Sequence, residues 1–295
     1  MSNLLYCPKF FEDILMPQPY ITTNENIRMP GLLYGTAWKK DRTADLVEQA
    51  ILCGFRGIDT ACQPKHYDEA LVGEALKRVR HQGIMREDLF VQTKFTPVSG
   101  QDPARIPYDL KAPLELQVSQ SFEASKRNLQ TPYIDSWVLH SPLFPYAHLS
   151  TVWGAMERVY HSGGVRQLGI SNCYDLELLK RLYTDAEVKP AVVQNRFYAE
   201  SGYDAELRQW CDEKGVVYQS FWSLTANPHI LENNTVRVLA EKYATGEAQI
   251  WYRYLSHVRI VPLIGSTSKQ HMDEDLRIFE FELTAEEIAR ITSLL

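Results

Sequence analysis

The chain alternates short apolar runs of strand length with longer stretches in which apolar side chains recur at helical spacing. Such an alternation predicts repeated strand-helix units and a parallel sheet. Eight strand-like runs follow one another, and helical patterns lie between them. The runs are GLLYGT, FRGIDT, LFVQTK, SWVLHS, RQLGISN, AVVQN, VVYQSF and VPLIGS.

The eightfold alternation predicts an α/β fold, a (β/α)8 TIM barrel that forms a single domain over residues 1–295. Length alone, at ~150 residues per domain, suggests two domains, but α/β barrels of ~250 residues fold as one. Residues 1–19 are expected as an N-terminal extension, with a hairpin around residues 23–27. Predicted strands include 32–34, 134–139, 166–170, 191–194, 216–220 and 260–264. Helical stretches begin near 43, 268 and 284 or span 68–80, 114–128, 150–161, 175–183, 205–214, 235–243 and 247–256.

Two loops are longer than the short connections of such a barrel. TPVSGQDPARIPYDLKAP follows Lys94 and contains four prolines, so an extended flap over the barrel mouth is expected. SLTANPHILENN follows Phe221 and is a second candidate lid. Both loops leave from the end of a predicted strand, which places them at the rim where barrel enzymes collect their active sites.

Seven of the eight runs end in residues that can do chemistry, and the carboxyl ends of barrel strands converge on one mouth. The pattern therefore predicts one shared site. The first run ends at Gly35 and Thr36, without an obvious catalytic group. The other runs end at Asp59 and Thr60, Lys94, His140 and Ser141, Ser171 and Asn172, Gln194 and Asn195, Ser220, and Gly265 and Ser266.

Composition restricts the classes of partner. The formal net charge of −6 gives no basic field for nucleic acid or for an anionic membrane surface. No apolar run approaches the length of a membrane span, and the N-terminus lacks the pattern of a secretory signal. The five cysteines contain no CxxC pair, so neither a disulfide framework nor a metal site is expected. We expect a cytoplasmic protein that acts on a small molecule.

Five segments resemble, in order, the motifs of the aldo-keto reductase family: GFRGIDTACQPKHYDEALVGEAL, FVQTKF, IDSWVLHSP, GVRQLGISN and FEFELTAEEI. The resemblance covers roughly residues 20–291. It implies a monomeric (β/α)8 enzyme that uses NAD(P)H to reduce an aldehyde or ketone, or catalyses the reverse reaction. NADPH is the expected cofactor, and NADH is the alternative.

The resemblance assigns four catalytic residues. Hydride addition to a carbonyl builds negative charge on its oxygen, so an acid is needed there, and Tyr67 has that role. Lys94 is expected to lower the pKa of Tyr67, Asp59 to keep Lys94 charged, and His140 to orient the carbonyl. Taken singly, each of these residues also fits a purely structural role: a cap for Asp59, a solvent-facing lysine for Lys94 and a core histidine for His140.

The chain departs from the family pattern before Tyr67. Residues 62–66 stand between the Asp-Thr-Ala segment and Tyr67, where most members have two residues. The motif therefore leaves open whether Tyr67 reaches Lys94. The adenine side also departs, because the resemblance implies Lys, Arg and Asn where Gly265, His271 and Asp275 stand. These losses weaken the case for a clamp on a 2′-phosphate.

The remaining expected binding residues follow from the resemblance and from the aromatic character of the mouth. The expected cofactor residues are Gly35, Thr36, Asp59, Ser171, Asn172, Gln194, Phe221, Leu224, Gly265, Ser266, Thr267, Lys269, His271 and Asp275. The expected substrate residues are Trp38, Ser141, Phe144 and Trp222, with Tyr108 as a further candidate from the flap. No metal ligand is expected.

Two other functions stay open at the level of sequence. One is a regulatory subunit that binds the cofactor with little turnover. The other is a lyase or isomerase that uses Lys94 to form a Schiff base, which would need an uncharged lysine. The presence of all four catalytic residue types argues against the first, and Asp59 beside Lys94 argues against the second.

Overall fold

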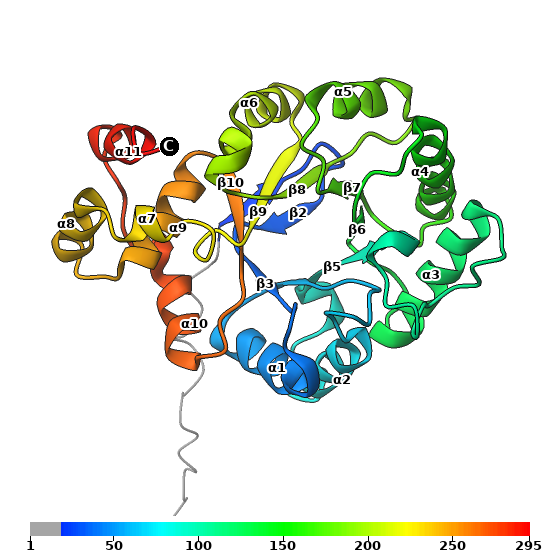
Figure 1. The fold of residues 1–295 in the computed structure, drawn as a ribbon. Helices are drawn as coiled ribbons and strands as arrows, with labels where there is room; N and C mark the ends of the chain where they lie inside the picture. The colour runs from blue at the N-terminus through cyan, green and yellow to red at the C-terminus, as the bar shows by residue number, and fades with distance from the viewer. Residues whose placement is uncertain (1–18) are drawn as a thin grey trace, which may run out of the picture.

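The computed structural model describes residues 19–295, and these form a closed barrel of eight parallel strands surrounded by helices (Figure 1). The predicted TIM barrel is therefore confirmed. The last barrel strand pairs with both its predecessor and the first barrel strand, which closes the sheet. The barrel strands are β3 (Leu33–Gly35), β4 (Gly57–Asp59), β5 (Phe90–Phe95), β6 (Ser136–Leu139), β7 (Leu168–Ser171), β8 (Val192–Arg196), β9 (Val217–Phe221) and β10 (Ile260–Ile264).

The outer helices follow the predicted order. They are α1 (Thr43–Cys53), α2 (Glu69–Arg80), α3 (Leu114–Leu129), α4 (Tyr146–His161), α5 (Leu176–Asp185), α6 (Ala205–Lys214), α7 (Pro228–Leu231), α8 (Asn234–Lys242), α9 (Glu247–His257), α10 (Lys269–Leu276) and α11 (Ala285–Thr292). The capping box predicted at Thr284 is present at the start of α11. Helix α4 begins at Tyr146, four residues before the predicted start. The helix starts directly after Pro145, and its first turns bury Leu149 in the core.

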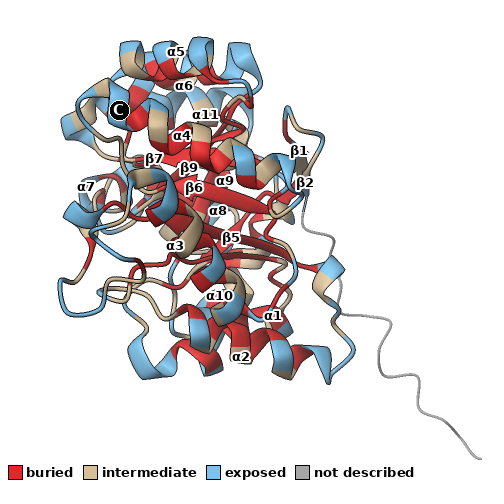
Figure 2. Ribbon diagram, turned by 90° about the vertical axis from the view of Figure 1, so that its right-hand side faces the viewer, coloured by how far each residue is buried: buried red, intermediate tan, exposed pale blue. Residues whose placement is uncertain are grey.

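The predicted hairpin is formed by β1 (Tyr20–Thr22) and β2 (Arg28–Pro30), which pair antiparallel. Met29 is fully buried and belongs to a cluster at the amino ends of the barrel strands, with Leu33, Phe90 and Val217 among its members. Figure 2 shows the hairpin at one end of the buried strands and α7 at the other. The hairpin thus closes the end opposite the candidate site. Residues 1–18 of the predicted extension lie outside the described residues.

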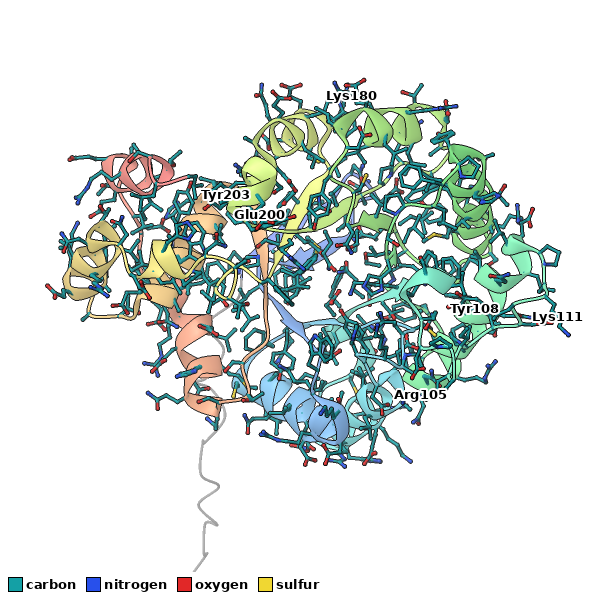
Figure 3. All side chains as sticks on the ribbon, viewed as in Figure 1. Arg105, Tyr108, Lys111, Lys180, Glu200 and Tyr203 are labelled. Atoms are coloured by element: carbon teal, nitrogen blue, oxygen red, sulfur yellow. The ribbon has the colours of Figure 1, made fainter. Side chains whose placement is uncertain are left out.

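The flap after β5 packs against α3 instead of presenting Tyr108 to the mouth. Tyr108 is buried, its hydroxyl donates to the Thr96 carbonyl at 2.8 Å, and its ring lies 5.7 Å from that of Phe95. In Figure 3 the labelled flap residues Arg105, Tyr108 and Lys111 lie on the α2 and α3 side of the barrel. The expectation that Tyr108 lines the mouth is wrong, because its hydroxyl bond turns the ring into the core.

Candidate active site

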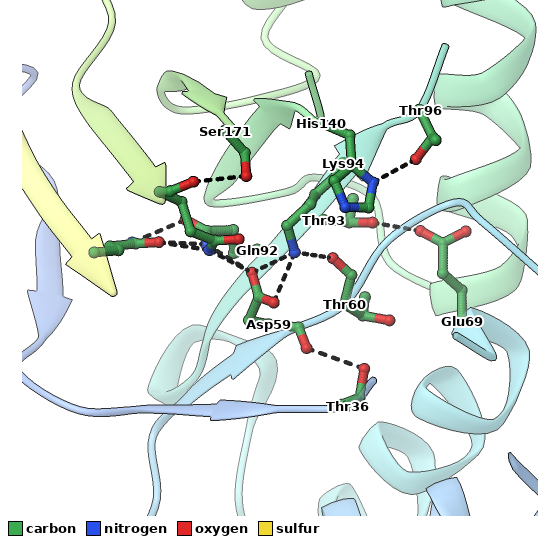
Figure 4. A network of polar contacts seen from close by, with 12 residues as sticks. Thr36, Asp59, Thr60, Glu69, Gln92, Thr93, Lys94, Thr96, His140 and Ser171 are labelled. Atoms are coloured by element: carbon green, nitrogen blue, oxygen red, sulfur yellow. Dashed lines mark hydrogen bonds and ion pairs between the residues drawn. The ribbon is translucent and has the colours of Figure 1, made fainter. Parts of the chain in front are cut away.

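A buried ion pair occupies the centre of the barrel mouth. Lys94 on β5 is 1% exposed and Asp59 at the end of β4 is 2% exposed. The Lys94 Nζ donates to Asp59 Oδ1 at 2.8 Å, to Asp59 Oδ2 at 2.7 Å and to the Thr60 carbonyl at 2.8 Å (Figure 4). Three acceptors match the three donors of an ammonium group. Although burial lowers the pKa of Lys94, the Asp59 carboxylate opposes that shift, and the bonding is that of a charged lysine.

Three glutamines support Asp59 from inside the barrel. Gln92 and Gln194 each donate their amide nitrogen to Asp59 Oδ1, at 2.7 and 3.1 Å, and both also donate to Gln219 Oε1 at 2.8 Å. Gln219 donates back to Gln92 Oε1 at 3.1 Å. Of this Gln92–Gln194–Gln219 cluster, sequence reasoning found only Gln194. The missed signal was the strand period of two, since Gln92 and Lys94 share a face of β5.

The residues before Tyr67 fold into an anchored turn. Tyr67 N and His66 N both donate to the Gln63 carbonyl, at 3.1 and 3.2 Å, and the Gln63 amide donates to the Gly100 carbonyl at 2.7 Å. Lys94 Nζ lies 5.3 Å from the centre of the Tyr67 ring. The Tyr67 and His140 rings are 6.0 Å apart in an edge-to-face arrangement. The structure therefore places Tyr67 beside Lys94 and His140, a proximity that the sequence left undecided.

The protonation of Tyr67 differs from the sequence expectation. Burial, followed by the negative charge of Asp59, raises the pKa of Tyr67 above its usual value. The lowering of the Tyr67 pKa expected from Lys94 is wrong for the free protein, because the phenol is buried and because Asp59 pairs with Lys94 and offsets its positive field. Tyr67 is therefore a neutral phenol that holds a proton to donate.

His140 is held as a neutral imidazole. Burial lowers its pKa well below the usual value, and the charges of Lys94 and His66 lower it further. Its Nδ1 lies 2.6 Å from the Thr96 hydroxyl, and its backbone carbonyl accepts a hydrogen bond from the Asn172 side chain at 2.9 Å. When the Thr96 hydroxyl donates to Nδ1, Nε2 carries the ring proton and can donate to an oxygen in the cavity.

A cavity of about 1050 Å³ extends from this cluster to the start of α10. Most of the sequence-predicted site residues line it, which makes the mouth a single continuous site. Those lining it are Gly35, Trp38, Asp59, Tyr67, His140, Ser171, Asn172, Gln194, Phe221, Trp222, Leu224, Gly265, Ser266, His271 and Asp275. Lining residues that sequence reasoning missed include Lys39, Arg196, Gln249 and Tyr252.

Besides the buried Lys94 and Tyr108, five predicted site residues lie outside the cavity lining. Thr36 is fully buried, and its hydroxyl donates to the Asp59 carbonyl at 3.0 Å, so it supports β4. Phe144 is 71% exposed, and Ser141 does not reach the cavity. Thr267 is exposed, and Lys269 pairs with Asp273 at 2.8 Å on the surface of α10. These positions could not be separated by sequence, because their distance from a strand end does not fix where the side chain points.

The far end of the cavity carries a cation that the sequence pattern did not predict. Lys39, from the loop after β3, donates to the Gly265 carbonyl. A Cβ added at Gly265 would lie 3.5 Å from Lys39 Nζ, so the amine fills space beside the missing side chain. Nearby, Asp275 is 4% exposed and accepts from the Gln249 amide at 2.7 Å. Burial raises the pKa of Asp275 to about 7.

Comparison with known proteins decides the family. The sequence profile described as "Aldo/keto reductase family" matches residues 31–295. The chain belongs to the aldo/keto reductase family. Relatives within it include the glyoxal reductase of Bacillus subtilis, which is 29% identical over 86% of this chain and 84% of that protein. Another is the NADPH-dependent alpha-keto amide reductase of Saccharomyces cerevisiae, 28% identical over 94% of this chain and 91% of that protein.

Solved aldo-keto reductase structures share the barrel. One from Brucella melitensis is 26% identical, with a TM-score of 0.80 over 95% of this chain and 100% of that chain. The Bombyx mori enzyme in complex with NADP is 25% identical, with a TM-score of 0.79 over 95% of this chain and 93% of that chain.

Neither a metal site nor a membrane-spanning helix is found in the described part of this aldo-keto reductase. Residues 19–295 contain no group of three or more His, Cys, Asp or Glu side chains arranged to hold a metal ion. Within the same residues, no helix combines the length and the apolar character that crossing a membrane requires.

Proposed function

We propose that this protein is an NAD(P)H-dependent reductase that converts an aldehyde or ketone to an alcohol, or catalyses the reverse reaction. The observation that carries the proposal is the convergence of Tyr67, His140 and the Asp59–Lys94 pair at one end of a large cavity. A proton donor, a neutral imidazole and a buried cation beside one another are the groups that carbonyl reduction requires.

The donor set of the cavity fits a nicotinamide dinucleotide. Gln194 commits its amide nitrogen to Asp59 and Gln219, and among residues 19–295 its Oε1 accepts no hydrogen bond. That oxygen and Asn172 can bind a carboxamide, while the aromatic ring of Phe221 lines the same end. At the other end, Lys39 and the first residues of α10 suit phosphate. We propose NADPH as the cofactor, as in the yeast reductase and the Bombyx mori complex.

When bound, the nicotinamide supplies the hydride, and the residues of this chain manage the charge that hydride transfer creates. The Tyr67 hydroxyl donates its proton to the carbonyl oxygen as negative charge develops there. Lys94 stabilises the phenolate that Tyr67 becomes, and Asp59 with its glutamines holds Lys94 in position. Because the pKa of Tyr67 is raised in the free protein, its proton is retained until an oxyanion begins to form.

The two alternative functions receive less support. A Schiff base would need Lys94 as a free amine, but Nζ is buried and engaged by three acceptors. A subunit that only binds the cofactor needs neither the buried ion pair nor a Tyr67 ring beside Lys94 and His140.

Trp38 and Trp222 line the mouth and favour an aromatic or apolar carbonyl compound. A monomeric state, a cytoplasmic location and one domain over residues 1–295 stay predictions.

The proposal is tested by NADPH consumption with a panel of aromatic and aliphatic carbonyl compounds. We expect turnover of at least one aromatic aldehyde, with one alcohol formed per NADPH oxidised. NADPH labelled with deuterium at the transferred position should give an alcohol that carries the label. NADPH binding without turnover on the whole panel would favour the regulatory alternative, and borohydride trapping of an adduct on Lys94 would favour the lyase.

A further inference from the structure

Arg196 stands at the carboxyl end of β8 and lines the cavity. It is in register with Phe221 on β9 and two residues after Gln194, so it lies at the end of the cavity that contains Tyr67 and His140. Its guanidinium lies 4.3 Å from the centre of the Trp222 ring and 5.3 Å from that of Tyr198. Two aromatic faces therefore hold the planar group in place at the mouth.

Within the described part of the chain, the Arg196 charge has no counter-ion. Among residues 19–295, no Asp or Glu oxygen lies within 4.0 Å of its guanidinium nitrogens, and its side chain donates no hydrogen bond to the protein. The partly buried Arg86, by contrast, pairs with Asp135 at 2.6 Å, and the side chains of Arg56 and Arg208 donate to backbone carbonyls. The acidic residue nearest the reactive centre, Asp59, is already bound by Lys94. The five donors of Arg196 are thus available to a ligand.

An anion at this place has two conceivable sources, the phosphates of the cofactor and an acidic group on the substrate. The phosphate-compatible groups, Lys39 and the residues around Ser266, lie at the α10 end of the cavity. Arg196 is instead adjacent to the residues proposed to bind the nicotinamide ring, where the substrate carbonyl must also sit. Its position therefore fits the substrate better than the phosphates.

We propose that Arg196 binds the carboxylate of the carbonyl substrate, so that the preferred substrates are aldehyde or keto acids with an aromatic or apolar body. This inference rests on the proposed reductase function and adds the substrate class. The guanidinium would bind the carboxylate through two parallel hydrogen bonds. Trp222 would pack on the apolar part, and Tyr67 would reach the carbonyl. The carboxylate is unchanged by the reaction, which adds one hydride and one proton across the C=O bond.

A matched pair of probes separates charge from shape: 4-formylbenzoate and its methyl ester. The wild-type protein should have the higher kcat/KM for the acid. Arg196→Gln should lower kcat/KM for the acid by about 10- to 100-fold, mainly through KM, as expected for loss of a charged hydrogen bond. The ratio of acid to ester should fall by the same factor. Arg196→Lys, which keeps the charge and loses the fork, should give an intermediate ratio.

Arg237→Gln on the exposed face of α8 is the matched control, because it makes the same charge change away from the cavity. It should leave the ratio as in the wild type. Equal losses on acid and ester in Arg196→Gln, or a loss of NADPH affinity in a fluorescence titration, would overturn the proposal. The second result would assign Arg196 to the cofactor.

Benzoate binding tests the role of Arg196 without requiring turnover, and so independently of the proposed reductase function. Benzoate should quench tryptophan fluorescence of the wild-type protein and bind Arg196→Gln at least tenfold more weakly, while benzamide should show no such difference. If the wild type reduces no compound of the carbonyl panel, the reductase proposal fails, and benzoate binding still tests the anion site. Equal benzoate binding by both proteins would refute the role of Arg196.

Discussion

The two ends of the cavity are built differently. At the Tyr67 end, one atom, Asp59 Oδ1, accepts hydrogen bonds from three side chains, those of Lys94, Gln92 and Gln194. Each of these donors is almost fully buried. At the α10 end, Gly265 and Thr267 are exposed, and Lys269 pairs only with its helix neighbour Asp273. The first end is rigid because its polar groups satisfy one another, whereas several residues at the second end are exposed to solvent, although Asp275 is buried.

This difference separates two tasks. A hydride and a proton must reach one carbon and one oxygen, so the groups at the Tyr67 end have to be held within fractions of an ångström. Binding a nucleotide tail tolerates substitution, because exposed contacts contribute little individually. At the α10 end, which we call the tolerant end, Gly265, His271 and Asp275 depart from the expected family pattern. At the Tyr67 end, Asp59, Lys94 and His140 keep that pattern, and only the turn before Tyr67 departs from it.

Lys94→Met should have the largest effect at the rigid end. It removes the cation beside Tyr67 and leaves the Asp59 carboxylate buried without its partner. We expect turnover to fall about 10²- to 10⁴-fold and the free energy of unfolding to fall by about 3–5 kcal/mol. Rates of NADPH oxidation and denaturant unfolding measure the two effects. Lys180→Met on the surface of α5 is the control and should change the unfolding free energy by less than about 0.5 kcal/mol.

A double variant distinguishes catalysis from stability at the same pair. Asp59→Asn with Lys94→Met removes both charges, while an asparagine oxygen can still accept from Gln92 and Gln194. Most of the lost stability should return, and turnover should stay at the level of the single variant. Restored turnover in the double variant would mean that Lys94 acts only by keeping the barrel folded.

Gln92→Leu should have an intermediate effect. It keeps the side-chain volume and removes one donor to Asp59 and the hydrogen bonds to Gln219. We expect a loss of about 1–3 kcal/mol in unfolding free energy and a fall in turnover of roughly tenfold. Gln209→Leu, on the exposed part of α6, is the control. If turnover is unchanged although stability falls, the glutamine cluster only stabilises the barrel core and does not position the catalytic groups.

Asp275→Asn tests the tolerant end through pH. Because burial raises the pKa of Asp275 to about 7, the folded state favours the protonated carboxyl, whereas an unfolded Asp titrates near ~3.9. The unfolding free energy of the wild type should therefore fall as the pH rises from about 4 to about 7. Asparagine does not titrate, so the stability of the variant relative to the wild type should be higher at pH 8 than at pH 5, by at most about 3 kcal/mol. An equal difference in unfolding free energy between variant and wild type at pH 5 and at pH 8 would contradict this account.

The sequence predicted the order of strands and helices because the β/α alternation is repeated along the chain. The pattern gave the bounds of Ala205–Lys214 correctly, and it located Asp59, Lys94 and His140 at strand ends. It could not decide whether Tyr67 reaches Lys94, since that depends on how Gln63 anchors the inserted turn. Side-chain direction was equally hidden, as the buried Tyr108 and the exposed Phe144 illustrate.

The direction of the Tyr67 pKa shift was also beyond the sequence. A lysine beside a phenol suggests a lowered pKa, but the sign depends on whether another group neutralises that lysine and on how far the phenol is buried. Both are three-dimensional quantities. In the folded protein, Asp59 and burial together reverse the expected direction. Arg196 was missed for a similar reason, because an arginine next to a strand end is usually solvated.

Tyr67→Phe tests the central claim most directly, since it removes one hydroxyl from the rigid end and leaves the ring in place. The measurement is the single-turnover rate of NADPH oxidation with a saturating aldehyde, beside the NADPH dissociation constant. We predict a rate at least about 10²-fold lower, with cofactor affinity within twofold of the wild type and of a Tyr146→Phe control on the surface of α4. A rate equal to that of the wild type would contradict the claim that Tyr67 delivers the proton.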